Sequence, residues 1–205
     1  MSFYRLCVFC GSRSGARPEY TAAAQRLGQQ LTSRRIGLVY GGASVGLMGV
    51  LAGSVMEAGG TVDGVIPDSL VDRELAHRGI TRVHQVRSMH ERKATMARLS
   101  DGFIAMPGGA GTLDELFEIV TWAQLGLHAK PIGLLDVGGY FQPLVTFLRH
   151  AVAEGFLHAG DMGAEPDGSG RLVVVDRDVA RLLDRMAERH GALPPGDPRL
   201  GIDQA

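Results

Sequence analysis

The stretch I-G-L-V-Y-G-G-A-S-V-G at residues 36–46 decides the fold, because it changes from a strand pattern to a helix start within a few residues. Its first five residues form a short apolar run, and Gly41 and Gly42 then break that run. A helical apolar pattern begins at Gly46. A strand that ends in a glycine turn and leads directly into a helix is typical of an α/β protein with a parallel sheet.

The same alternation of short β-rich runs and longer helical patterns extends in both directions from this stretch. Strands are predicted at residues 5–10, 36–40, 61–66, 81–86, 102–106, 132–135 and 172–175. Helices are predicted at residues 18–34, 46–58, 88–99, 112–125, 142–154 and 178–189. We therefore expect a single α/β domain over residues 1–190, with a mostly parallel sheet and helices on both faces. A glycine-rich surface loop is predicted at 160–170 and a flexible, proline-containing tail at 191–205.

The composition indicates an ordinary compact protein with one hydrophobic core. The chain has 205 residues, of which 45% are hydrophobic and 21% charged, and its net charge is −1. It lacks the basic excess needed to bind a nucleic-acid backbone, so we expect no DNA or RNA partner. We find no signal-peptide core and no apolar run of about 20 residues, which predicts a cytoplasmic protein without a membrane segment.

Neither the cysteines nor the histidines predict a metal site. Cys7 and Cys10 have C-x-x-C spacing but lie within a predicted strand, where an odd separation sends the two side chains to opposite faces. They are better interpreted as structural thiols than as a redox pair or half of a zinc site. The seven histidines are scattered without ligand spacing, so we expect no metal cofactor.

Three turns follow predicted strands at the edge where an open parallel sheet binds ligands. They are G-S at residues 11–12, G-G-A-S-V-G at 41–46 and P-G-G-A-G-T at 107–112. Glycines let backbone N–H groups approach an anion, and the following helix adds a partial positive charge. Either glycine cluster alone is equally well interpreted as a tight turn. Two at corresponding strand ends favour a phosphate ligand held by Gly41, Gly42 and the loop from Gly108 to Thr112.

The absence of two known sequence motifs narrows the choice of phosphate ligand. No G-K-[ST] sequence is present, and no acidic residue follows the second strand, so neither a P-loop nor a dinucleotide site is indicated. A mononucleotide fits better. The only lysines are Lys93, in a predicted helix beside an arginine, and Lys130, before a proline. Neither is suited to form a Schiff base, so pyridoxal phosphate and other cofactors are not expected.

Two charged residues beside these turns are candidates for chemistry. Thr112 and Glu115 have the spacing of a helix capping box, and a capping carboxylate would also be fixed at the mouth of the site. Arg92 interrupts an apolar stripe on the predicted helix at 88–99. It therefore needs a carboxylate, a ligand phosphate or solvent at the sheet edge, or it extends its head into water past a packed stem. Lys93 would add positive charge near the same opening.

Three motifs together resemble the LOG (Lonely Guy) family. They are Y-G-G-A-S-V-G-L-M-G at residues 40–49, S-M-H-E-R-K at 88–93 and P-G-G-A-G-T-L-D-E at 107–115, within a similarity that runs from about Val8 to Glu154. The resemblance implies a Rossmann-like fold, a homodimer and cytokinin riboside 5′-monophosphate phosphoribohydrolase activity. Many members of the family were first labelled lysine decarboxylases.

Carried over by position, the resemblance implies specific roles for residues of this chain. Catalysis would fall to Arg92 and Glu115. Substrate contacts would come from Glu74, Lys93, Gly109, Ala110, Gly111, Thr112 and Thr121. The chain departs from the family at Ala43, which replaces a usual third glycine, and at Ala110, where plant members often have a tyrosine. The second change alters the pocket wall and leaves the preferred base open.

The chemistry expected is hydrolysis of an N-glycosidic bond in a nucleoside 5′-monophosphate such as AMP or N6-isopentenyl-AMP. Positive charge builds on the ribose during this reaction, so the Glu115 carboxylate would stabilise it and activate water. Arg92 stays protonated and would orient Glu115, bind phosphate or steady the departing base. The alternative is a nucleotide-binding sensor or carrier, which would keep the glycines but need neither Arg92 nor Glu115.

Overall fold

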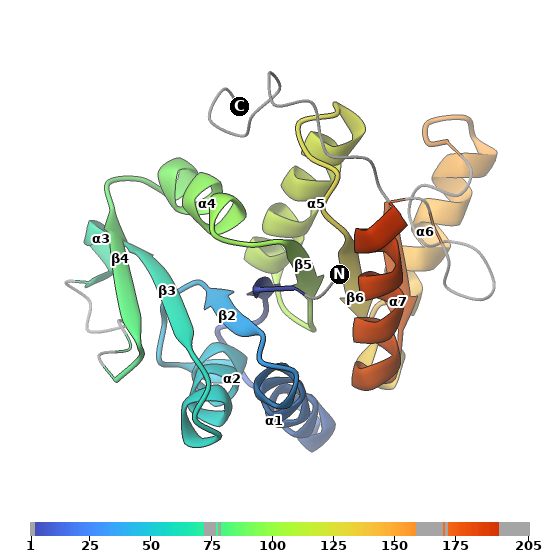
Figure 1. Ribbon diagram of the computed structural model, residues 1–205. Helices are drawn as coiled ribbons and strands as arrows, with labels where there is room; N and C mark the ends of the chain where they lie inside the picture. Colours follow the sequence, from blue (N-terminus) through green and yellow to red (C-terminus); the bar gives the residue numbers. More distant parts are fainter. Residues whose placement is uncertain (1–2, 72–76, 78, 159–169, 171, 193–205) are drawn as a thin grey trace.

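The structure, a computed structural model, describes residues 3–71, 77, 79–158, 170 and 172–192 (Figure 1). Its strands are β1 (Arg5–Phe9), β2 (Gly37–Tyr40), β3 (Val62–Pro67), β4 (Arg82–Val86), β5 (Gly102–Ala105), β6 (Ile132–Leu135) and β7 (Val173–Asp176). Its helices are α1 (Pro18–Ser33), α2 (Gly46–Glu57), α3 (Asp68–Val71), α4 (Met89–Arg98), α5 (Ala110–Gln124), α6 (Gln142–Ala153) and α7 (Val179–Ala192), with a 3-10 helix η1 (Val137–Gly139).

The strands form one sheet in the order β4-β3-β2-β1-β5-β6-β7, and each neighbouring pair is parallel. From β1 the chain builds outward to β4 and then returns to the other side of β1 to start β5. The strand order therefore reverses between β1 and β5. In an open parallel sheet, this is the point beyond whose carboxyl ends ligands bind.

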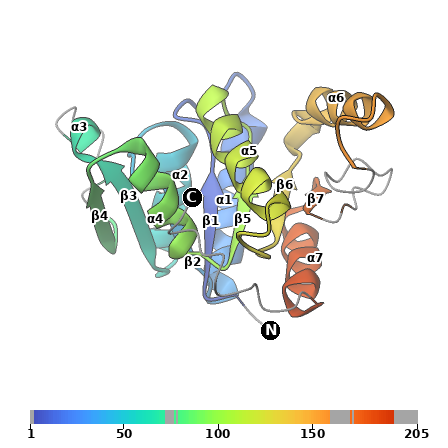
Figure 2. The same ribbon diagram turned by 90° about the horizontal axis from the view of Figure 1, so that it is seen from above.

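Alternate residues along the buried strands feed two apolar cores, one on each face of the sheet. Helices α1, α2 and α7 cover one face, and α4, α5 and α6 cover the other. Figures 1 and 2 show α4 and α5 on the opposite side of the sheet from α1 and α2. The predicted α/β class, with a parallel sheet covered on both faces, is confirmed.

The two cysteines occupy different cores, as their odd spacing predicts. Cys7 packs in the core under α4 and α5, whereas Cys10 packs in the core under α1 and α2. Both are free and buried, and burial raises the pKa of each thiol well above its ordinary value. Neither side chain is therefore suited to redox or metal chemistry.

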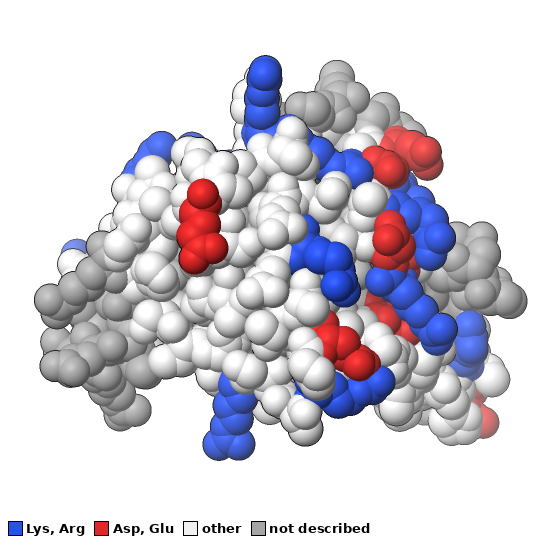
Figure 3. All heavy atoms as spheres, turned by 90° about the horizontal axis from the view of Figure 1, so that it is seen from below, with Lys and Arg blue, Asp and Glu red and all other residues white. Residues whose placement is uncertain are grey.

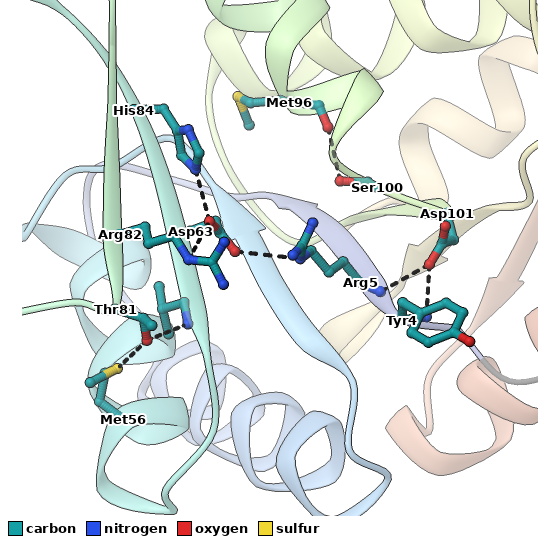
Figure 4. Close-up of polar contacts among 11 residues, drawn as sticks. Tyr4, Arg5, Met56, Asp63, Thr81, Arg82, His84, Met96, Ser100 and Asp101 are labelled. Atoms are coloured by element: carbon teal, nitrogen blue, oxygen red, sulfur yellow. Dashed lines mark hydrogen bonds and ion pairs between the residues drawn. The ribbon is translucent and has the colours of Figure 1, made fainter.

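A buried carboxylate ties three strands together at the amino end of the sheet (Figure 4). Asp63 on β3 is 2% exposed and lies 2.8 Å from His84 Nε2. The guanidinium groups of Arg5 and Arg82 lie 3.5 and 3.8 Å from its oxygens. Arg5 and Arg82 are the first residues of their strands, so this cluster sits at the end of the sheet opposite the glycine turns.

The predicted strands and helices are found in the structure with boundaries that differ by at most three residues. The largest functional difference is α5, which begins at Ala110 rather than Thr112. Helix α7 continues through Ala192, so the predicted tail starts two residues too early, and its remainder, 193–205, lies outside the described residues. Of the predicted loop at 160–170, only Gly170 is described. Among described residues, no helix combines the length and apolar composition needed to cross a bilayer.

Candidate active site

The three glycine turns meet at the carboxyl ends of β1, β2 and β5. The Gly11 N–H donates to the Pro107 carbonyl at 3.1 Å, and the Leu47 N–H donates to the Gly11 carbonyl at 3.0 Å. A Cβ on Gly108 would lie 2.9 Å from the Gly11 nitrogen and would overlap the Thr112 hydroxyl. Glycine at position 108 therefore lets the turns after β1 and β5 pack together at the switch point.

The loop before α5 presents an open helix N-terminus. Gly109 is the N-cap residue and has an extended conformation. As a glycine, it has no side chain that could cap the helix. Residues 109–111 are exposed, and a Cβ on Gly109 or Gly111 would meet no atom within 4 Å. The first N–H groups of a helix lack intrahelical acceptors and carry partial positive charge. This loop can therefore accept an anion such as a phosphate.

The predicted capping box at Thr112 is wrong. Thr112 is the third residue of α5, not the residue before it, because the glycine at 109 already provides the extended cap conformation. Its side chain is buried against Gly108. Glu115 therefore lies one turn further into the helix than a capping carboxylate would, and it is released for other contacts.

Arg92 and Glu115 form a buried ion pair beside this loop. The Arg92 Nη1 and Glu115 Oε1 atoms are 3.1 Å apart, and each residue is 8% exposed. Arg92 Nε also donates to the Val65 carbonyl at 3.1 Å, and Nη2 donates to the Gly41 carbonyl at 3.5 Å. One guanidinium thus joins the ends of β2 and β3 to the carboxylate on α5. The requirement for an anion near Arg92 is met by Glu115.

The environment of Glu115 tunes its proton affinity. Burial raises the pKa of the Glu115 carboxyl, Arg92 lowers it, and the nearby Asp114 raises it again. The net direction is upward, because desolvation of the charged form is the largest effect. A carboxylate held in place and poised in this way suits general base or electrostatic chemistry.

Lys93 faces carboxylates of α5 in this structure. Its Nζ lies 3.2 Å from Asp114 Oδ2 and 3.0 Å from Glu118 Oε1, and its side chain is only 15% exposed. Lys93 lies next to Arg92 on α4, and a substrate phosphate would have to compete with these two carboxylates for it. Its contact with substrate stays a prediction.

The remaining predicted contact residues occupy different settings. A Cβ on Gly41 would overlap Arg92 Nη2, and Gly42 has a positive φ of 75° packed against β3. Both glycines thus have a structural reason to be there. Thr121 is exposed on α5, and its hydroxyl donates to the Phe117 carbonyl at 2.7 Å. Glu74 lies outside the described residues.

The sequence analysis did not predict the N-terminal cap of α4, which lies one turn before Arg92. The Ser88 hydroxyl accepts a hydrogen bond from the Glu91 N–H at 3.1 Å and caps α4. The Glu91 carboxylate reaches back to the Arg87 N–H at 2.8 Å. The S-x-x-E pattern at residues 88–91 is a capping-box signal and could have been recognised. The cap fixes the start of α4 only one turn before Arg92.

Comparison with known proteins identifies the family. Residues 48–166 match a family described as possible lysine decarboxylase. The cytokinin riboside 5′-monophosphate phosphoribohydrolase LOG7 of Arabidopsis thaliana is 57% identical over 188 residues, 92% of this chain and 82% of the relative. The chain belongs to the LOG family. Another relative, the probable cytokinin riboside 5′-monophosphate phosphoribohydrolase LOGL9 of Oryza sativa subsp. japonica, is 49% identical over 91% of this chain and 78% of its own length.

Solved structures place the LOG family chain among proteins of the same fold. The molybdenum cofactor carrier protein of Chlamydomonas reinhardtii aligns with a TM-score of 0.67 at 22% identity, covering 91% of this chain and 98% of that one. The molybdenum cofactor binding protein of Rippkaea orientalis aligns with a TM-score of 0.65 at 20% identity, covering 92% and 98%. These similarities support the Rossmann-like fold alone.

The lysines of this LOG family chain have structural partners. The Lys130 ammonium donates to the Ala97 carbonyl at the end of α4 at 2.7 Å, and Lys93 is paired with α5. A lysine that forms a Schiff base must instead be free to attack a carbonyl. The described residues also contain no cluster of three or more His, Cys, Asp or Glu side chains arranged for a metal ion.

Proposed function

We propose that this protein hydrolyses the N-glycosidic bond of a nucleoside 5′-monophosphate, a cytokinin ribotide or AMP, to the free base and ribose 5-phosphate. The observation that carries the proposal is the buried Arg92 and Glu115 pair, 3.1 Å apart beside the open N-terminus of α5. The relatives named as phosphoribohydrolases support the same reaction.

The roles follow from the chemistry of bond cleavage. As the base departs, positive charge develops on the ribose ring, and a carboxylate beside the ring stabilises that charge. Glu115 also accepts a proton from the water that adds to the anomeric carbon, while the bond to the base breaks. Arg92 remains protonated, so it holds the carboxylate and does not act as the acid. The leaving base takes its proton from solvent, and Glu115 then returns its own proton to solvent.

The loop from Gly108 to Thr112 would bind the 5′-phosphate through backbone N–H groups. Asp114 and Glu115 would repel that phosphate, so the helix N-terminus and neighbouring cations must outweigh them. Phosphate binding would then supply energy to hold the ribose over Glu115. Contacts from Lys93, Thr121 and Glu74 belong to this proposal, because the family resemblance implies them.

The test is product analysis with matched substrates. The purified protein is incubated with AMP and with N6-isopentenyl-AMP, and free base is measured by chromatography. Adenosine at the same concentration should be hydrolysed at least about 100-fold more slowly, which corresponds to about 2.7 kcal/mol of lost transition-state binding. Comparable kcat/KM for AMP and adenosine would contradict the phosphate site. Tight binding of AMP without any release of adenine would favour a sensor or carrier instead.

We also propose that the protein is a homodimer. Helix α2 carries no charged residue before Glu57, yet Met48, Val50 and Met56 are only partly buried. Figure 3, which views the face that carries α1 and α2, shows few charged side chains on the left part of this face, where α2 lies, and many on the right part. Pairing of such faces would bury them. A monomeric mass by light scattering at micromolar concentration would contradict this proposal.

Cytoplasmic location and the absence of nucleic-acid or membrane partners remain predictions from the sequence.

A further inference from the structure

Tyr140 reaches the loop from Gly108 to Thr112 from the neighbouring turn, which follows β6. It follows η1, directly after β6, and its hydroxyl donates a hydrogen bond to the Gly108 carbonyl at 2.5 Å. The two residues are 32 positions apart in the chain. The bond therefore joins the turn after β6 to the turn after β5.

The peptide between Gly108 and Gly109 needs such a restraint. In a trans peptide, the carbonyl and the following N–H point in opposite directions, so the direction of the Gly108 carbonyl fixes that of the Gly109 N–H. Because glycines flank this peptide on both sides, it can rotate with little steric resistance. The hydrogen bond from Tyr140 removes that freedom. It directs the Gly109 N–H away from the tyrosine, in a segment that is exposed and has open space around Gly109.

The Tyr140 ring is itself held in place. It packs edge-on against Tyr20 and Phe141, with ring centroids 5.8 and 5.1 Å apart and interplanar angles of 81° and 84°. Asp136, which is fully buried, accepts a hydrogen bond from the Phe141 N–H at 2.8 Å. The η1 turn is further tied to the start of α1 by Arg17, which donates to the Gly138 carbonyl at 3.3 Å. Tyr140 is thus a fixed support for the loop.

We propose that Tyr140 is a positioning residue that sets the Gly108–Gly109 peptide, so that the Gly109 N–H is presented to the substrate phosphate. This inference rests on the proposed function, because it assigns the phosphate to the same loop. Tyr140 acts through the loop and does not take part in bond cleavage. Tyr140 therefore affects how strongly the protein binds the substrate phosphate, and it does not affect the bond cleavage at Glu115.

The main test compares Tyr140→Phe with the wild-type protein on AMP and on adenosine. Loss of one hydrogen bond should lower kcat/KM for AMP about 5–10-fold and weaken inhibition by ribose 5-phosphate by the same factor. Activity on adenosine and the thermal midpoint should stay unchanged. Tyr4→Phe is the matched control, since it loses the same atom from a residue that is 85% exposed and lies directly before β1. Equal losses on AMP and adenosine, or no loss on either, would overturn the assignment.

A second variant tests the path through Gly109. Gly109→Pro deletes the N–H while leaving the Gly108 carbonyl available to Tyr140. Adding Tyr140→Phe to this variant should weaken ribose 5-phosphate binding, measured by calorimetry, by less than 2-fold, because both changes remove the same contact. Full additivity would refute the mechanism. If wild-type protein binds ribose 5-phosphate but releases no base, the proposed function fails while this binding test still decides the role of Tyr140. If wild-type protein releases base but does not bind ribose 5-phosphate, the role of Tyr140 fails while the proposed hydrolysis stands.

Discussion

The pairing of Arg92 with Glu115 is hard to explain by stability alone. Removing two charges from water is expensive, and well-packed apolar residues often stabilise a fold equally well. Yet the Arg92 guanidinium pairs with the Glu115 carboxylate and donates hydrogen bonds to the carbonyls of Val65 and Gly41, all at the ligand end of the sheet. The arrangement is better explained as fixing one carboxylate at the opening of the site.

Glu115→Gln should abolish most activity without unfolding the protein. The amide is nearly isosteric but carries no charge and cannot accept the proton of water. We expect kcat with AMP or N6-isopentenyl-AMP to fall by about 100-fold or more, the scale of losing one electrostatic or acid-base group. Circular dichroism and the thermal midpoint monitor folding. Retention of full activity in the folded variant would exclude a catalytic role for this carboxylate.

Arg92→Ala should also strongly lower kcat/KM, and we expect Arg92 and Glu115 to act as a unit. In that case the double variant with Glu115→Gln loses much less than the sum of the two single losses, expressed as free energies. The quantity measured is kcat/KM for the four members of the cycle on one ribotide. Additive losses would mean that Arg92 serves a separate function, such as direct phosphate binding.

The pH dependence of kcat should show the same coupling. Burial raises the pKa of Glu115 and Arg92 lowers it, with a net upward shift. Activity that needs the carboxylate is therefore lost as pH falls through this raised pKa, at a higher pH than for an exposed glutamate. Replacing Arg92 by Met removes the lowering contribution, so the acid limb should move to still higher pH. Arg92→Lys keeps a charge and serves as the control. An unmoved limb in the Met variant would contradict the coupling.

Individual site residues were predictable only where one local pattern singled them out. Arg92 stood out because it interrupts an apolar helical stripe, and the structure shows the anion that it needs. The cap assigned to Thr112 was wrong, since a glycine can take the extended cap conformation without any side-chain signal. Tyr140 had no signal at all. Its contact with Gly108 depends on where η1 is placed in three dimensions.

At the scale of elements, the turn after β2 is shaped around the guanidinium. A Cβ on Gly41 would overlap Arg92 Nη2, so Gly41→Ala should push the guanidinium away from Glu115. We expect at least a 10-fold loss of kcat/KM on a ribotide, because a small misplacement of a catalytic group is costly. The acid limb of the kcat profile should also move upward, as in Arg92→Met.

Gly53→Ala provides the control for that turn. Gly53 lies within α2, and a Cβ there would meet no atom of the same chain within 4 Å. Because Val50 and Met56 lie on the same side of this helix, in the face that we propose pairs in the dimer, light scattering first checks that the variant keeps the wild-type mass. Alanine is favoured over glycine in a helix interior by about 0.5–1 kcal/mol, so this variant should be slightly more stable and fully active. Chemical denaturation and the ribotide assay measure the two properties. Equal activity losses in both glycine variants would show that the effect does not arise from the Arg92 contact.

Long elements were readable from the sequence and short ones were not. Buried parallel strands are continuous apolar runs, and their helices have clear apolar periods, so both patterns extend over enough residues to be recognised. Helix α3 and η1 span only four and three residues. Their geometry is imposed by the chain segments around them. Gly138, for example, adopts a positive φ of 58° within η1, which no local apolar pattern predicts.

At the scale of the whole molecule, the strand order creates the site. Adjacent β1 and β5 lead into helices on opposite faces, and their turns meet beyond the sheet. The sequence predicts that parallel strands occur, but not their order, because pairing partners lie far apart in the chain. The Asp63 cluster that ties β1, β3 and β4 at the other end was also not foreseen, since it depends on that order.

Global stability should decrease in mild acid because of one buried histidine. His128 is 7% exposed, with Nε2 2.9 Å from the Ile119 carbonyl and Nδ1 accepting the Lys130 N–H at 3.1 Å. Both ring nitrogens are thus satisfied in the neutral form with a proton on Nε2, and Nδ1 cannot take a second proton without losing its bond. Burial lowers the pKa of His128 from 6.5 to about 4.

This depressed pKa sets the sign and the window of the effect. In the unfolded chain His128 is protonated near pH 6.5, whereas in the folded protein it is protonated only near pH 4. The stabilisation is therefore fully present above pH 6.5 and is lost progressively as pH falls towards 4, by on the order of 2–3 kcal/mol. His128→Gln cannot titrate and can still donate to the Ile119 carbonyl. Its unfolding free energy, measured by urea denaturation at pH 7 and pH 4.5, should decline less than that of the wild type. Parallel declines in both proteins would assign the acid sensitivity to other groups.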